Sequence, residues 1–169
     1  MVTRDDYRED TVQAARSVLL ELTHILGGFR KDIVLVGGWV PGLILPNSEP
    51  QHLGSIDVDL ALNHKTITGE TYQTICKLLK DRDYRAGQQP FIFLRDVILN
   101  RKTYEVQVDL LAGEYEGSGK SHRHQKVQDV MARKTRGCDL ALEYPVEVKL
   151  EGILPEGGKD SVLVRVASV

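Results

Sequence analysis

The chain has 169 residues, of which 41% are hydrophobic and 27% are charged, and its formal net charge is -2. This length fits one domain of ordinary size with a real core, and the composition is typical of a soluble globular protein. The slight acidic excess argues against a general nucleic-acid-binding protein, which would carry a basic surplus, but it leaves room for a local basic surface.

Cysteine usage and the N-terminal sequence indicate a reducing compartment. Cys76 and Cys138 stand far apart, without CxxC spacing or a histidine cluster, so we interpret them as small apolar residues and not as a disulfide or zinc site. Residues 1–11 are too charged for a secretory signal. The apolar run over 33–46 is interrupted by glycines and is too short to span a bilayer. We therefore expect a cytoplasmic protein without a membrane partner.

The first part of the chain predicts a helix followed by two strands. Apolar residues recur at helical spacing over 5–26, and Gly27-Gly28 supplies a stop. A β-branched run over 33–36 predicts a buried strand. The elements expected next are a short helix over 39–45, a loop over 46–54 and a second strand over 55–62.

The rest of the chain predicts a helix, a hairpin and a last pair of strands. An amphipathic pattern over 68–81 indicates a helix. Strand-like runs over 91–99 and 103–111 are joined by a short polar link and predict an antiparallel hairpin. The remaining elements are a long glycine- and charge-rich loop over 112–128 and two alternating strands over 146–150 and 162–166. This order predicts an α/β or α+β fold, with helices packed on one face of the sheet.

Three carboxylates mark the expected functional site. Asp57 and Asp59 are two residues apart in the second strand, so their side chains point to the same face. Adjacent carboxylates repel each other and raise each other's proton affinity, and a hard divalent cation such as Mg²⁺ relieves that repulsion. Asp109 lies on the polar face of the later strand over 103–111, where it could meet the first two.

The order of these elements resembles the nucleotidyltransferase superfamily, which has the polymerase-beta-like fold. The resemblance rests on Val36-Gly37-Gly38, on the acidic strand over 55–60 (SIDVDL), and on the single aspartate in 108–110 (VDL). More narrowly, GGWVPGLIL followed by HLGSIDVDLAL is similar to the AbiEii-like nucleotidyltransferases, the toxin half of abortive-infection and toxin–antitoxin pairs, and to the related MenT toxins. The resemblance covers most of the chain from about residue 33 onwards, and it implies a nucleotidyltransferase-type mixed sheet.

The resemblance implies Mg²⁺-dependent transfer of a nucleoside monophosphate from an NTP, such as ATP, to a hydroxyl group, with release of pyrophosphate. Asp57 and Asp59 would hold two Mg²⁺ ions. One ion would neutralise the departing pyrophosphate, and the other, shared with Asp109, would lower the pKa of the attacking hydroxyl. Asp109 could also take the proton as a general base. The acceptor could be an RNA such as tRNA, a protein or a small molecule, and a cognate antitoxin is an expected partner.

The resemblance also implies a phosphate-binding turn. Gly37 and Gly38 would let the backbone approach the triphosphate, with the amides of the following helix facing its oxygens. Ser55 could donate a hydrogen bond to a phosphate oxygen.

Two features depart from the family pattern. The segment PNSEPQ (46–51) looks inserted between the glycine pair and the acidic strand, where it could border the pocket. The AbiEii-like pattern continues into a lysine-bearing helical part, whereas this sequence ends at Val169. We therefore expect residues 1–169 to be a single catalytic domain, truncated before a C-terminal helical part.

Other interpretations of the motif lead to different functions. A haloacid-type phosphatase also uses DxD, but Asp59 is followed by Leu-Ala-Leu, so the strand continues past the motif. A nucleotide-sugar glycosyltransferase would need a longer nucleotide-binding half upstream. The chain could also be a non-catalytic nucleotidyltransferase-fold domain that binds nucleotide or a partner protein. The basic run over 120–136 is either a solvated face or a contact for phosphate or RNA.

Overall fold

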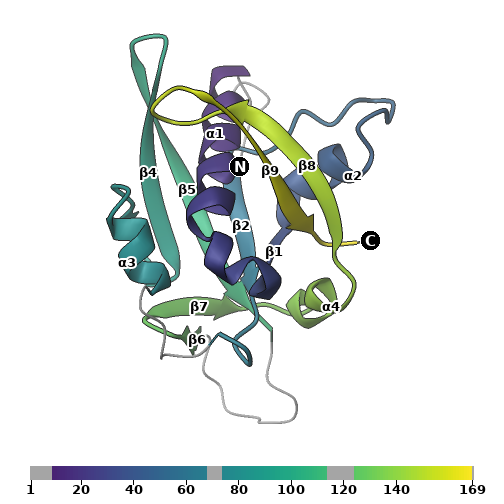
Figure 1. Ribbon diagram of the computed structural model, residues 1–169, viewed down its shortest axis with the longest axis vertical. Coiled ribbons are helices and arrows are strands. Elements are labelled where there is room, and N and C mark those ends of the chain that lie inside the picture. The colour runs from purple at the N-terminus through teal and green to yellow at the C-terminus, as the bar shows by residue number, and fades with distance from the viewer. Residues whose placement is uncertain (1–8, 68–73, 114–123, 169) are drawn as a thin grey trace.

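A computed structural model describes residues 9–67, 74–113 and 124–168. The described chain forms one open mixed sheet with the strand order β3-β4-β5-β2-β1-β9-β8, and β7 pairs with both β5 and β6 (Figure 1). The strands are β1 (Ile33–Val36), β2 (Asp57–Leu62), β3 (Arg85–Ala86), β4 (Ile92–Leu99), β5 (Lys102–Ala112), β6 (His124–Val127), β7 (Val130–Lys134), β8 (Val146–Ile153) and β9 (Lys159–Val166). The α-helices are α1 (Glu9–Ile25), α2 (Val40–Ile44), α3 (Ile75–Lys80) and α4 (Cys138–Glu143), with 3-10 turns at Gly27–Asp32 and Gly37–Trp39.

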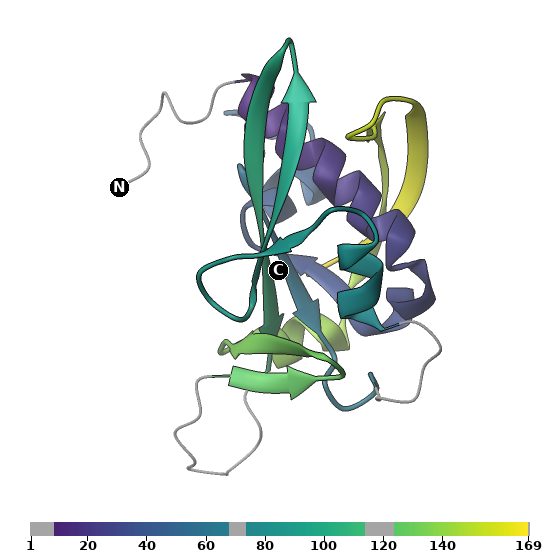
Figure 2. The same ribbon diagram turned by 90° about the vertical axis from the view of Figure 1, so that its left-hand side faces the viewer.

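The core forms where the curved sheet wraps around α1. Figure 2 shows α1 lying between the β4–β5 hairpin and the β8–β9 hairpin. The helical spacing of its apolar residues gives α1 a fully buried stripe that includes Val18 and Leu22. The guanidinium of Arg16 donates hydrogen bonds of 3.1 and 3.0 Å to the carbonyl oxygen of Glu151, which ties the helix to the edge strand β8. Among the described residues, no helix has the length and apolar character needed to cross a membrane.

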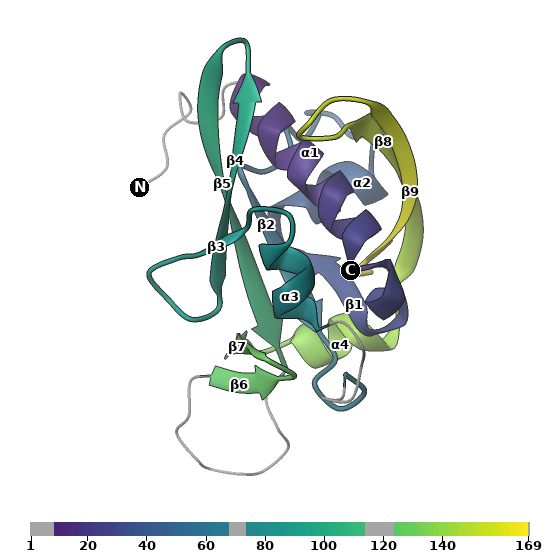
Figure 3. The same ribbon diagram turned by 60° about the vertical axis from the view of Figure 1, so that its left-hand side comes forward.

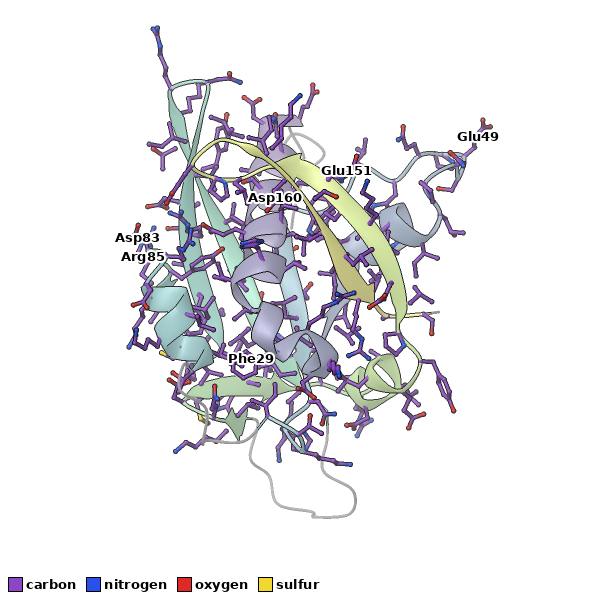
Figure 4. The ribbon with its side chains drawn as sticks, viewed as in Figure 1. Phe29, Glu49, Asp83, Arg85, Glu151 and Asp160 are labelled. Atoms are coloured by element: carbon purple, nitrogen blue, oxygen red, sulfur yellow. The ribbon has the colours of Figure 1, made fainter. Side chains whose placement is uncertain are left out.

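Most predicted elements are confirmed within the described ranges. The first helix, both early strands, the β4–β5 hairpin and the final strand pair all form close to their expected positions. The short helix predicted over 39–45 is a 3-10 turn followed by α2, with Pro41 in the first turn. The loop between α2 and β2 projects from the body of the molecule, with Glu49 near its tip (Figure 4).

The structure departs from the predictions in the second half. The helix predicted over 68–81 forms only as α3, and residues 68–73 lie outside the described chain. The predicted loop over 112–128 ends in β6, and β3, β7 and α4 were not predicted. The prediction that the helices pack on one face of the sheet is correct for α1 but wrong for α4. Cys138 of α4 packs on Ala61 and Leu111, which face away from α1. Figure 3 shows α4 and β7 at the end of the sheet where β5 ends.

A buried polar network fastens α1 to the sheet. Glu21 of α1 is 3% exposed and accepts a 2.7 Å hydrogen bond from the Tyr84 hydroxyl and a 3.2 Å bond from Nε of Arg95, which is 7% exposed. The Arg95 guanidinium also lies 5.7 Å from the centre of the Tyr84 ring. Burial, followed by the adjacent Glu21 carboxylate, raises the pKa of Tyr84 well above its ordinary value. Each charge in this network has a partner, so its role is structural.

We expect the Glu21→Leu substitution to lower the free energy of unfolding by about 3 kcal/mol or more, because it leaves the Arg95 charge buried without its main carboxylate. The double variant Glu21→Leu/Arg95→Met should lose much less, since both charges are then gone. Asp81→Asn, which breaks the exposed pair with Lys77, is the control and should change stability by no more than about 0.5 kcal/mol. Chemical denaturation measures all three. A Glu21→Leu protein as stable as the control would contradict this assignment.

Candidate functional site

The three predicted carboxylates come together on one face of the sheet. Strands β2 and β5 are parallel neighbours, and their register places Asp59 directly opposite Asp109 and Asp57 opposite Gln107. Because side chains alternate along a strand, all of these point away from α1. The intervening residues Val58, Leu60, Val108 and Leu110 point to the other face and are buried under α1. The buried pattern therefore fixes the positions of the carboxylates.

The pKa of the Asp59 carboxylate is clearly raised. Burial, then the neighbouring charges of Asp57 and Asp109, raise the pKa of Asp59 from 3.8 to about 6, while Arg133 acts in the opposite direction. Asp109 is only 8% exposed. Two carboxylates on adjacent strands and a third two residues away thus share a poorly solvated site.

Neutral side chains hold two of the carboxylates in place. The hydroxyl of Ser55, a buried residue, donates a short hydrogen bond to Oδ1 of Asp57. Nε2 of Gln107 donates a 2.7 Å hydrogen bond to Oδ2 of Asp109. Ser55, predicted as a phosphate contact, therefore contacts an acidic side chain in this structure. Gln107 was not predicted, although its place two residues before Asp109 in one strand was the available signal.

The glycine pair packs directly against the acidic strand. Gly37 adopts a left-handed conformation with φ of +75°, and a methyl group added to its Cα would overlap Oδ2 of Asp59. A methyl group on Gly38 would lie 2.8 Å from Oγ of Ser55. Trp39 is buried, and its Nε1 donates a 2.8 Å hydrogen bond to the carbonyl oxygen of Asp57. Glycine is therefore needed at both positions because a side chain would clash with Asp59 or Ser55. The predicted approach of this turn to a triphosphate remains a proposal.

A basic and aromatic group lies across the carboxylates from the glycine turn. Arg133 of β7 pairs with Leu111 of β5, so it shares the face of Asp109. Its guanidinium carbon lies 5.7 Å from the centre of the Phe91 ring, and Phe91 also contacts the His124 ring at 5.4 Å. In the sequence Arg133 belongs to a basic run, and its position relative to the carboxylates was not predicted because β7 was not predicted. His122, Lys120 and Arg123 of that region lie outside the described residues.

The floor of the site is apolar. Cys138 of α4 is buried against Ala61 and Leu111, and burial, then nearby Asp139 and Asp59, raise the pKa of its thiol to about 11. The thiol therefore stays protonated at neutral pH and acts as a small apolar residue, as predicted. The loop that looked inserted lines a different cavity of about 450 Å³, together with Arg16, Trp39 and Lys149.

The donor set suits a hard cation. Carboxylate oxygens are the ligands that Mg²⁺ prefers, and the serine and glutamine hydrogen bonds engage one oxygen each of Asp57 and Asp109. In their present rotamers, no group of three or more His, Cys, Asp or Glu side chains within the described ranges is arranged to hold a metal ion.

Comparison with known proteins found no matching family model, no similar curated protein and no similar solved structure.

The raised pKa of Asp59 predicts a pH-dependent stability. The folded protein binds this proton more tightly than the unfolded chain does, so the stabilisation is complete below about pH 4 and is lost as the pH rises towards 6. We expect Asp59→Asn to match the wild type near pH 4 and to be more stable at pH 7. Unfolding measurements in urea between pH 4 and 7.5, without divalent ions, test this. A stability difference that stays constant over this range would show that Asp59 does not titrate as described.

The Gly37→Ala substitution tests the contact with Asp59. We expect a loss of about 3 kcal/mol or more, because the methyl group adds a steric clash to the left-handed backbone cost of about 1–2 kcal/mol. Gly157→Ala, at φ +90° with no atom within 4 Å of the added methyl group, isolates the backbone cost. In an Asp59→Ala background the Gly37→Ala loss should shrink. Equal losses in both backgrounds would exclude the contact.

Proposed function

We propose that this chain is a Mg²⁺-dependent nucleotidyltransferase with a nucleotidyltransferase-type mixed sheet, which moves a nucleoside monophosphate from an NTP to an acceptor hydroxyl. One observation carries the proposal: Asp59 and Asp109 stand opposite each other on parallel neighbouring strands, with Asp57 two residues before Asp59 on the same face. The support is the chemistry of this donor set. Three crowded, poorly solvated carboxylates are stable together when a hard cation binds them.

In this proposal Asp57, Asp59 and Asp109 hold the metal. Bound Mg²⁺ would neutralise charge on the pyrophosphate leaving group and lower the pKa of the attacking hydroxyl. Asp109 would accept the proton of that hydroxyl, and the hydrogen bond from Gln107 would orient its carboxylate. Gly37, Gly38 and Ser55 form the wall beside Asp59, where the phosphate chain would lie.

The proposed acceptor is defined only by its hydroxyl group, and it is an RNA such as tRNA, a protein or a small molecule. A toxin of a toxin–antitoxin or abortive-infection pair, with a cognate antitoxin as partner, is the biological setting that the sequence resemblance favours.

Calorimetric titration with Mg–NTP tests the metal site. We expect the wild type to bind, and the Asp57→Asn/Asp59→Asn variant to lose the Mg²⁺-dependent part of the affinity, because the charge that attracts the cation is gone. Asp81→Asn removes an exposed carboxylate at the C-terminal end of α3; it is the matched control and should bind normally. Unchanged affinity in the double variant would reject the metal site.

Catalysis needs a second experiment. Each labelled NTP is incubated with the protein and a cell extract, and the label is then located on RNA, protein or a small molecule. Transfer that depends on Asp109 supports the enzyme. Binding of Mg–NTP without transfer would instead favour the alternative, a non-catalytic domain that binds nucleotide.

A further inference from the structure

If the proposed function holds, the carboxylate site must bind an NTP with more negative charge than Mg²⁺ alone would balance. An NTP adds a polyanion to a face that already carries three carboxylates, and the nearest neutral groups, Ser55 and Gln107, supply no positive charge. Phosphoryl-transfer sites meet this need with cationic side chains, and arginine is suited to it because its planar guanidinium can donate two hydrogen bonds to one phosphate.

Arg133 is placed to meet this need. Its register partner, Leu111, lies two residues beyond Asp109 on the same face of β5. Strand spacing and rise put the Cα atoms of Arg133 and Asp109 on the order of 8 Å apart, within reach of an arginine side chain.

The guanidinium contacts an aromatic ring and has no ion-pair partner among the residues that the structure describes. It lies over the Phe91 ring, and Phe91 itself is only 7% exposed and therefore fixed by packing. Among the described residues, no carboxylate forms an ion pair with Arg133, although the side chain is exposed and the acidic cluster is near. By contrast, Arg30, Arg85 and Arg95 all pair with acids. Arg133 thus has an aromatic contact and, among the described residues, no ion-pair partner for its charge.

We propose that Arg133 binds the phosphate chain of the nucleotide on the carboxylate face, with Phe91 as the residue that positions its guanidinium. This inference rests on the proposed nucleotidyltransferase function and adds a substrate-binding residue to it. The nucleotide then lies between a turn of backbone at Gly37 and Gly38 and a cation on the far side of the carboxylates. Lysine would supply the charge without the planar stacking or the two-pronged hydrogen bond.

The test is calorimetric titration of Mg–NTP and Mg–tripolyphosphate. We expect Arg133→Gln to weaken both ligands about tenfold or more, and Arg133→Lys to weaken them less, because a charge-assisted hydrogen bond is lost or only partly replaced. Arg101→Gln is the matched control: it removes the same charge in the turn just before β5, eight residues before Asp109 and roughly 26 Å away along the strand direction. It should leave both affinities unchanged.

A double-variant cycle tests the part played by Phe91. We expect Phe91→Leu to weaken binding in the wild-type background and to have no further effect in Arg133→Gln, because Phe91 acts through the guanidinium. Thermal unfolding of each variant separates this from a loss of fold, which would weaken binding equally in both backgrounds. A Phe91→Leu loss that persists in Arg133→Gln would overturn the positioning role.

The outcomes separate this inference from the function on which it rests. If the wild type binds Mg–tripolyphosphate and Arg133→Gln binds it equally well, the Arg133 assignment is overturned and the metal site stands. A loss confined to the NTP would place Arg133 on the sugar or base and would also overturn the phosphate assignment. If the wild type binds neither ligand, the proposed function fails together with this inference.

Discussion

The in-register parallel pairing of β2 with β5 is the constraint on which the site depends. Val58 and Val108 lie side by side under α1, and so do Leu60 and Leu110, all of them buried. A shift of one residue would turn valine and leucine towards solvent and aspartate into the core, so burial of apolar area holds the register. Asp59 and Asp109 are adjacent as a consequence of that register. Packing of the core thus holds the carboxylates close together despite their electrostatic repulsion.

The surroundings make this crowding more severe. The glycine turn closes over Asp59 because Gly37 has no side chain, and the apolar group of Ala61, Leu111 and Cys138 lies next to it on the same face. Burial is the leading cause of the raised pKa of Asp59, ahead of its two acidic neighbours. Both effects destabilise the charged form of Asp59, so this arrangement lowers the stability of the folded protein. Such local losses are concentrated at functional sites.

The sequence predicted the elements with strong periodicity and could not predict their long-range pairing. Strands β1, β2, β4, β5, β8 and β9 follow alternation or apolar runs, and the carboxylates were placed on polar faces by alternation alone. The parallel pairing of β2 with β5 joins segments about 50 residues apart, and no local pattern encodes it. Strand β7 was missed because it has only five residues and ends in Arg133 and Lys134, which were assigned to a basic run. Helix α4 was missed because six residues carry too little periodicity to recognise.

Two polar clusters on opposite faces of the sheet show why one of them is expected to bind a ligand. On the α1 face, Glu21 meets Arg95 and the Tyr84 hydroxyl, so opposite charges and a donor satisfy each other within the chain. On the other face, the described residues give Asp57 and Asp109 one neutral donor each, and the cation that acts on Asp59 is Arg133. The first cluster is complete, and adding a ligand would break existing bonds. The second has an excess of negative charge among the described residues, and it is there that we propose a cation and then a polyanion bind. The difference in charge balance therefore separates the structural cluster from the candidate site.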